Sequence, residues 1–257
     1  MNSERYAAEF ISQESVRENQ FNRIWTHDLI EVFSDVARYY DRANNVAALG
    51  LLNGLRKKFI DGIELQSGQR ALDVCAGTNV IGIDLLTRQP DLQMYAIDRS
   101  SEMQRVGQQR AQERGLTIDS TIRDVHQLPY PDNHFDVVTL QYASRHLRVV
   151  EVFEEIRRVL KPGGHFYHSD MLRPANKIVE QLYYLYLRAS VGFTAWLFGS
   201  GMTSLSCKTY FIDALRVFYS VDELSELLRQ IGFVDVRGKA MLGGAIGFHN
   251  AKVPTDK

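Results

Sequence analysis

The sequence predicts an α/β fold with a doubly wound, mostly parallel sheet. Three observations lead to this prediction. Between residues 70 and 169, short apolar runs alternate with helical segments of about 10 to 15 residues, the pattern of βαβ units. The chain of 257 residues is 45% apolar, enough for one large core. Two strand candidates near the end leave no room for a crossover helix, so they must pair antiparallel.

The first 64 residues are expected to form an N-terminal arm and a helical cover. Residues 1–25 are polar and show no clear period, which indicates a loosely attached arm. From Asp28 the apolar positions recur at helical spacing and predict a helix that runs to about Tyr40. The same spacing predicts a second helix over residues 46–60.

Residues 65–257 are expected to form the main domain, in which strands and helices alternate. Strands are predicted over residues 70–75, 92–97, 117–122, 135–140 and 165–169, with helices over residues 80–86, 101–114 and 149–160 and a turn over residues 161–164.

The end of the chain departs from this alternation. Residues 175–218 are rich in aromatic side chains, are broken by Gly199-Ser-Gly201, and are expected to form a helical lid after the fifth strand. A lid packed on the core is favoured over a membrane-inserting segment because a basic face is missing. Ser220 and Glu223 have the spacing of a capping box, and Gly232 ends that helix. Strands over residues 234–241 and 245–249 complete the sheet of seven.

Charge and cysteine content argue against several classes of protein. Thirty Lys and Arg against 31 Asp and Glu give a net charge of -1, so no bulk field favours nucleic acid or an anionic membrane. Cys75 and Cys207 are too few for a disulfide scaffold and suit a reducing cytosol. The N-terminus lacks the apolar stretch of a secretory signal, and no apolar run approaches the roughly 20 residues of a membrane span. A cytoplasmic protein is expected.

Two loops predict a nucleotide-like ligand at the carboxyl ends of the first two strands. Residues 73–79, Asp-Val-Cys-Ala-Gly-Thr-Asn, join a strand to a helix, where the backbone N–H groups of a small-residue loop can approach a polar ligand. About 20 residues later, Asp98 stands where a carboxylate accepts hydrogen bonds from both hydroxyls of a ribose. The alternative interpretation is a tight turn followed by a solvated acid.

A third acid extends this pattern. Asp124 falls at the tip of the third strand, where it can accept from an adenine amino group, and Val125 offers its backbone N–H. Together with residues 73–79, Asp98, the Phe-Asp-Val of residues 135–137 and the turn that ends at residue 164, the order resembles a class I S-adenosylmethionine-dependent methyltransferase. The resemblance implies a Rossmann-like methyltransferase fold and S-adenosylmethionine as the cofactor.

A closer resemblance covers most of the chain from about residue 30. Residues 33–41 with Asn44 and Gly50, residues 158–170, Pro174, Arg216, and Gly243-Gly244 with His249 are similar to the ubiquinone/menaquinone C-methyltransferase family. The resemblance implies that Thr78 and Gln141 contact the methionine part of the cofactor, Asp98 the ribose, and Asp124 and Val125 the adenine. The candidate cofactor-binding residues are Tyr40, Asp73, Gly77, Thr78, Asn79, Asp98, Arg99, Met103, Asp124, Val125, Gln141 and Tyr142.

Four positions depart from that family. Asn79 stands where Gly is usual, Ala43 replaces Met, and Leu52 and Leu55 replace His and Trp. Asn tolerates positive φ better than most residues, so the turn can survive, with the Asn79 side chain placed to crowd the methionine carboxylate. The other three lie in the segment expected to cover the substrate and therefore bear on the identity of the acceptor more than on the chemistry.

Carbon methylation of a hydroxylated ring needs an electron-rich ring and the later loss of a ring proton. Arg145 matches the family's arginine over the substrate and can stabilise a phenolate or orient a water, unless it only fixes the loop as an ion pair. His146 is a candidate general base, or a solvated loop histidine. Asp170 faces the pocket or caps the next helix, and Tyr40 and Asp41 contact the ligands or cap a helix end.

The expected function is S-adenosylmethionine-dependent methylation of a small aromatic acceptor, on a carbon of a quinol-like ring. The alternatives are O- or N-methylation of a secondary metabolite and a non-catalytic partner protein, which Asn79 suggests. Nucleic acid and an integral membrane segment are not expected, whereas a peripheral membrane contact and a homodimer stay open. No metal is expected either, because His165 and His168 fall on opposite faces of their strand.

Overall fold

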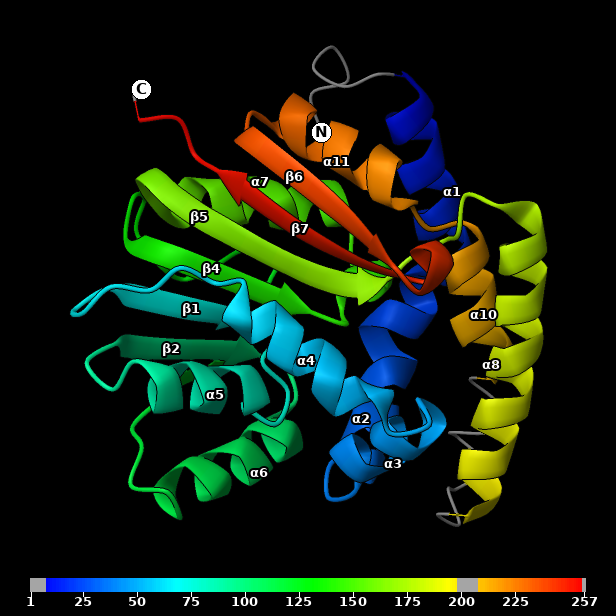
Figure 1. Ribbon diagram of the computed structural model, residues 1–257, viewed down its shortest axis with the longest axis horizontal. Coiled ribbons are helices and arrows are strands. Elements are labelled where there is room, and N and C mark those ends of the chain that lie inside the picture. The colour runs from blue at the N-terminus through cyan, green and yellow to red at the C-terminus, as the bar shows by residue number, and fades with distance from the viewer. Residues whose placement is uncertain (1–7, 198–207, 256–257) are drawn as a thin grey trace.

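The computed structural model describes residues 8–197 and 208–255. They form a seven-stranded sheet in the order β3-β2-β1-β4-β5-β7-β6, with helices on both faces (Figure 1). Strand β7 is antiparallel to β5 and β6, and the other neighbours are parallel, which confirms the predicted doubly wound sheet with an antiparallel last strand. The strands are Arg70–Val74 (β1), Gln93–Asp98 (β2), Asp119–Ile122 (β3), Phe135–Gln141 (β4), Leu160–Met171 (β5), Val234–Met241 (β6) and Ile246–Lys252 (β7).

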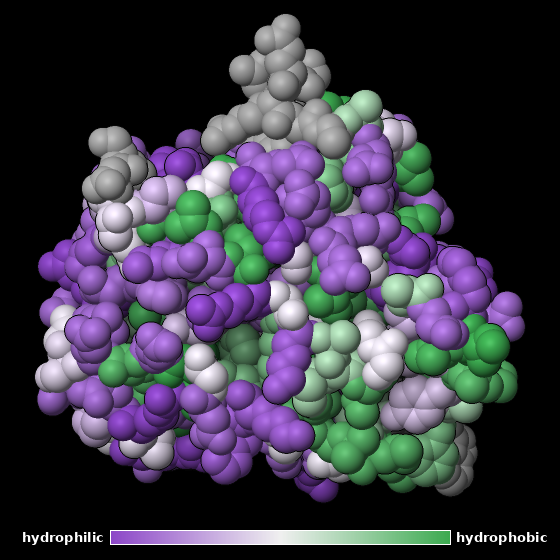
Figure 2. Space-filling view, turned by 45° about the horizontal axis from the view of Figure 1, so that its top comes forward, coloured by the Kyte–Doolittle hydropathy of each residue, from purple (hydrophilic) through white to green (hydrophobic). Residues whose placement is uncertain are grey.

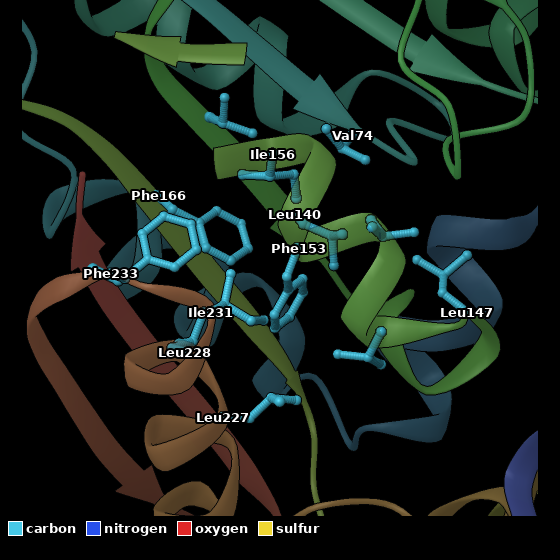
Figure 3. Packing of buried hydrophobic residues seen from close by; sticks show 14 of the residues in the cluster. Val74, Leu140, Leu147, Phe153, Ile156, Phe166, Leu227, Leu228, Ile231 and Phe233 are labelled. Carbon is cyan, nitrogen blue, oxygen red and sulfur yellow. The ribbon is translucent and has the colours of Figure 1, made fainter. Parts of the chain in front are cut away.

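The two faces of the sheet bury separate cores. Helices Leu51–Asp61 (α4), Val80–Arg88 (α5) and Ser101–Gln112 (α6) cover one face, and Val149–Val159 (α7) and Val221–Ile231 (α11) cover the other. Along β1, Leu72 belongs to the second core and Ala71 to the first, because side chains alternate across a strand. Figure 3 shows Phe153 of α7 and Ile231 of α11 gathered near Phe166 of β5.

A helical cover lies at the end of the sheet to which the arrowheads of the parallel strands point (Figure 1). Its N-terminal part is Ala8–Arg23 (α1), a π-helical turn Ile24–Asp28 (η1), Leu29–Val36 (α2) and Tyr40–Ala47 (α3). Its later part is Lys177–Leu197 (α8) and Lys208–Arg216 (α10), which form the predicted lid. The predicted break at Gly199-Ser-Gly201 lies outside the described residues. No helix in the described ranges is long and apolar enough to cross a bilayer.

The prediction of a loose arm is wrong for residues 8–23. They form helix α1, in which Phe10, Glu14, Arg17 and Phe21 are buried. These four positions share one helical face, but two of them are charged, so the apolar period that would reveal the helix is interrupted.

Three smaller predictions also need correction. The first cover helix ends at Val36, and the second begins at Leu51, because Leu49 and Gly50 take left-handed conformations with φ of 52° and 79°. The turn predicted over residues 161–164 is instead an irregular part of β5, with Gly163 at φ 77°. The capping box of Ser220 is confirmed.

Candidate active site

A cavity of about 760 Å³ lies between the carboxyl ends of the strands and the cover. Its lining joins the loops after β1 and β4 to side chains of α2, α3, α4, α8 and α10. Every predicted cofactor residue except Asn79 contributes to this lining: Tyr40, Asp73, Gly77, Thr78, Asp98, Arg99, Met103, Asp124, Val125, Gln141 and Tyr142. Residues separated by up to 102 positions in the sequence therefore meet at one cavity, as the predicted βα arrangement requires.

Asp98 organises the loop after β1. Its Oδ2 accepts a hydrogen bond from the Gly77 backbone N–H at 2.8 Å, and its Oδ1 accepts from the Ser100 N–H at 2.8 Å. Gly77 takes a left-handed conformation with φ of 51°, and a Cβ at this position would meet no atom within 4 Å, which leaves the backbone open to a ligand. Burial raises the pKa of the Asp98 carboxyl. An ionised carboxylate has about four acceptor sites, so the backbone contacts leave Asp98 able to accept from a hydroxyl group, as the sequence predicts for a ribose.

Asn79 has the predicted positive φ, 57°, but its side chain does not crowd the cofactor position. The residue is fully buried, and its Oδ1 accepts a hydrogen bond from Gln104 Nε2 of α6 at 2.8 Å. Gly107 on the same helix makes the space for it, because a Cβ there would stand 2.7 Å from Asn79 Nδ2. The amide therefore packs under the loop, against α6, and not against the methionine carboxylate.

Helix α3 is fastened to this loop. Thr78 Oγ1 donates a hydrogen bond to Asp41 Oδ2 at 2.9 Å, and the same carboxylate forms an ion pair with Arg110 of α6. Asp41 thus holds the cover to the cofactor loop and does not serve only as a helix cap.

Asp124 lies at the tip of β3 with its carboxylate partly exposed. The His126 backbone N–H donates to its Oδ1 at 2.8 Å, and the His126 ring lies 2.5 Å away. These contacts hold the pKa of the Asp124 carboxyl well below its usual range. An ionised acceptor at this point suits an adenine amino group.

Four buried polar atoms on the lining lack a partner among the described residues: Asp73 Oδ2, Gln141 Nε2, the Tyr142 hydroxyl oxygen and His146 Nε2. The first two, an acceptor and a donor, lie among the predicted cofactor residues. Burial raises the pKa of Asp73 to about 7, although Thr139 donates a hydrogen bond to its Oδ1 at 2.7 Å. A cation beside Asp73 would remove this penalty. The ammonium and carboxylate of an amino acid provide the charges that these two groups require, so they fit the methionine part of S-adenosylmethionine.

Arg145 supplies positive charge to the other end of the cavity. It lines the cavity, forms an ion pair with Asp170 and donates to the Tyr142 carbonyl at 2.9 Å. Burial alone would lower its pKa, but the Asp170 carboxylate outweighs that effect and the pKa is raised. Asp170 lies behind Arg145 and caps no helix, since Asn176 accepts the first N–H groups of α8. Tyr142 has a positive φ, 57°, which turns the chain sharply before Arg145.

His146 is buried and is not the solvated loop histidine of the alternative interpretation. Its Nδ1 lies 2.5 Å from the Tyr210 hydroxyl, which accepts a hydrogen bond from Trp25 Nε1 at 2.8 Å. Burial, followed by the charges of nearby arginines, puts its pKa well below the ordinary value. The imidazole is therefore neutral but weakly basic. Trp25 and Tyr210 were not predicted, because no local motif connects them with residue 146.

A buried chain of polar contacts continues from Asp170 into the core. Ser144 Oγ donates to Asp170 Oδ2 at 2.6 Å and lies 2.9 Å from His168 Nε2. His168 Nδ1 lies 3.2 Å from His249 Nδ1, and His249 Nε2 lies 3.1 Å from the Val221 carbonyl. Burial lowers the pKa of both histidines. Within residues 8–197 and 208–255, no cluster of three metal-ligand side chains occurs.

Apolar and aromatic side chains close the cavity over Arg145. Helix α8 contributes Tyr183, Tyr186 and Leu187, and α10 contributes Phe211 and Leu215. The Tyr186 hydroxyl donates to the Ala47 carbonyl and joins the lid to α3. This end of the cavity suits a flat apolar molecule that carries an oxygen for Arg145.

Comparisons with known proteins agree with this geometry. A family model described as the ubiE/COQ5 methyltransferase family matches residues 22–252. A demethylmenaquinone methyltransferase of Geobacillus kaustophilus is 35% identical over 225 residues, 85% of this chain and 93% of the relative. The ubiquinone/menaquinone biosynthesis C-methyltransferase UbiE of Pseudomonas putida is 29% identical over 228 residues, 87% of this chain and 88% of the relative.

Solved structures show the same fold at low sequence identity. A SAM-dependent methyltransferase from Aquifex aeolicus has a TM-score of 0.54 and 20% identity and covers 78% of this chain and 88% of its own. A putative S-adenosyl-L-methionine-dependent methyltransferase from Methanococcus maripaludis has a TM-score of 0.58 and 20% identity, with 87% and 94% covered.

Proposed function

The chain belongs to the ubiE/COQ5 methyltransferase family, whose members use S-adenosylmethionine, and on that premise we propose that it methylates a ring carbon of a quinol-like acceptor. The observation that carries the proposal is Arg145, a cation held by Asp170 on the wall of a mostly apolar cavity. The cofactor residues line the same cavity, so the methyl donor and the ring would meet inside one space.

The residues of this chain divide the work between the two ends of the cavity. When bound, S-adenosylmethionine supplies a methyl group on a positively charged sulfur. Asp98 and Asp124 would hold its nucleoside, and Asp73 and Gln141 its amino-acid part. Arg145 stabilises the oxyanion of the ring, which makes the neighbouring ring carbon nucleophilic. That carbon would take the methyl group from the bound sulfonium, and a water oriented by Arg145 would accept the proton that the ring carbon must lose to regain aromaticity.

An apolar rim supports an acceptor with a long hydrocarbon tail. Leu49, Leu51, Leu182 and Leu242 line the cavity and are also exposed, with 75%, 52%, 63% and 55% of their surface accessible. In Figure 2, hydrophobic side chains gather at the lower right of the face that the figure shows. Because the cavity must hold both the cofactor and the ring, a prenyl tail attached to the ring would leave the cavity across this rim. We therefore expect a cytoplasmic protein that touches the membrane surface there.

The test is methyl transfer from labelled S-adenosylmethionine to a reduced, short-chain demethylmenaquinone. We expect a product with one additional methyl group on a ring carbon, identified by mass spectrometry and NMR. Arg145→Gln is the matched control, which should bind the cofactor but form little product. A wild-type protein that binds the cofactor and labels neither quinols nor simpler phenols would overturn the proposal.

A second candidate is O-methylation of a related aromatic acceptor. Ala43, Leu52 and Leu55 all line the cavity, and they stand where the family usually has Met, His and Trp. The acceptor wall is therefore less polar than the family pattern at Leu52 and is lined by smaller side chains at Ala43 and Leu55. NMR of the product separates the two candidates, because a methoxy carbon and a ring methyl carbon resonate far apart.

A further inference from the structure

We propose that helix α1 is a positioning element of the active site, in which Glu14 and Arg17 clamp the loop that carries Arg145 and His146. The family model begins to match at residue 22, so nearly all of α1 lies outside it. The activity part of this inference rests on the proposed function. The structural part stands on the contacts of residues 144–149.

Arg17 is fully buried and binds the backbone of the loop. Its Nη2 donates to the carbonyls of Leu147 at 3.0 Å, Arg145 at 3.3 Å and Ser144 at 3.5 Å. The guanidinium carbon lies 4.7 Å from the centre of the Phe218 ring, which fixes the plane of the group. One side chain of α1 therefore binds the carbonyls on both sides of His146.

Glu14 holds the other end of the same loop. It forms an ion pair with Arg17, and its Oε2 accepts from the Val149 N–H at 3.0 Å, at the first residue of α7. Its Oε1 accepts from the Tyr219 hydroxyl at 2.8 Å. Residues 144–149 are thus tied to α1 at their start and at their end.

The energetics of this pair favour positioning over stability. A buried ion pair loses its hydration, and apolar side chains of similar size often stabilise a core equally well or better. Apolar replacements would, however, leave the carbonyls of residues 144, 145 and 147 without the donor that Arg17 provides. The specific contribution of the pair is therefore the path of the loop, which sets where the Arg145 side chain enters the cavity.

Helix α1 also contacts the lid. Gln13 Nε2 donates to the Val217 carbonyl at 3.0 Å, just after α10, and the rings of Phe21 and Tyr210 meet edge to face at 5.3 Å. Tyr210 is the residue whose hydroxyl contacts His146. Helix α1 thereby fixes the active-site loop and the lid relative to each other.

The test compares Arg17→Met with the wild type and with Glu18→Gln, an exposed change on the same helix. Misplacement of a catalytic group by about 1 Å can cost roughly 100-fold in rate, so we expect kcat to fall by about 10- to 100-fold. The dissociation constant of the cofactor should change by less than twofold, because Asp73, Asp98 and Asp124 lie on β1, at the end of β2 and on the loop after β3. Arg17→Lys should recover part of kcat, since an ammonium also donates to carbonyls.

Hydrogen exchange measured by mass spectrometry supplies a readout that does not depend on the acceptor. We expect peptides that contain residues 144–149 to exchange faster in Arg17→Met, and peptides of β1 and β2 to be unchanged. If Arg17→Met does not fold, Glu14→Gln is judged by the same criteria. Unchanged exchange over residues 144–149, or a kcat within twofold of the wild type, would overturn the inference. A wild type inactive on quinols contradicts only the proposed function.

Discussion

The two ends of the cavity are built by different means. At the cofactor end, the acids stand at strand tips and accept hydrogen bonds from N–H groups of the βα loops: Asp124 from that of His126, and Asp98 from those of Ser100 and, 21 residues earlier, Gly77. At the acceptor end, Arg145 depends on Asp170, 25 residues away, and on Arg17, 128 residues away. The acids of the cofactor end are therefore held by the βα loops themselves, whereas the loop of Arg145 is also held by the N-terminal part of the cover.

The largest effect that separates the two ends is expected for Arg145→Gln. Loss of one preorganised group that stabilises a developing anion typically costs about 100- to 1000-fold in kcat. The affinity for the cofactor, measured by calorimetry, should stay within twofold. If the affinity falls by the same factor as kcat, the two ends are not separable.

Asp98→Asn changes the cofactor end of the cavity and tests whether the acceptor end is left unaffected. An amide keeps the shape but loses the charge, and hydrogen bonds to charged groups are worth about 1.5 to 3 kcal/mol, so the cofactor should bind roughly 10- to 100-fold more weakly. At saturating cofactor, kcat should change only a few-fold. Asp119→Asn, an exposed acid at the start of β3, is the control. A reduced kcat with unchanged affinity would contradict this assignment.

Gly107→Ala tests how Asn79 is packed. The new Cβ would stand 2.7 Å from Asn79 Nδ2 and 2.8 Å from the Thr78 carbonyl carbon, so either the loop or α6 must shift. We expect the free energy of unfolding, from urea titration, to fall by about 2 kcal/mol, as for other overpacked sites. Asn79→Gly in the same chain should restore part of it. A Gly107→Ala protein as stable as the wild type would contradict the packing described for Asn79.

The smallest effect concerns pH. Burial raises the pKa of Asp73 to about 7, so the free protein is increasingly protonated there below pH 7. An ammonium group binds the ionised form, and one pH unit below a pKa reduces that form about tenfold. Affinity for the cofactor should therefore rise about tenfold from pH 6 to pH 8, and Asp73→Asn should remove the dependence. Equal pH profiles in the two proteins would exclude Asp73 from the methionine end.

How far the sequence could be interpreted follows the same division. Short sequence patterns predict the strands, the acids at their carboxyl ends and the capping box of Ser220, and the structure contains all of these. The positive φ of Asn79 could be predicted from the turn. The direction in which its amide packs could not, because that depends on Gly107, which lies outside the turn motif. The sequence does not predict helix α1, because Glu14 and Arg17 are charged residues at buried positions and so interrupt the apolar period of the helix. Their burial follows from a partner loop more than 120 residues away.

A chain of buried contacts runs from the Val221 carbonyl through His249, His168 and Ser144 to Asp170. It has fewer donor hydrogens than contacts to fill. The chain contains four contacts between polar atoms. The carbonyl and the ionised carboxylate have no hydrogen to donate, and the two neutral imidazoles and the hydroxyl have one each, so three hydrogens are available for four contacts. When His249 serves the carbonyl and Ser144 serves the carboxylate, the one hydrogen of His168 can bridge either the 3.2 Å gap to His249 or the 2.9 Å gap to Ser144, and the other gap stays unbridged. Burial puts the pKa of His249 at about 4, so only acid supplies the fourth hydrogen.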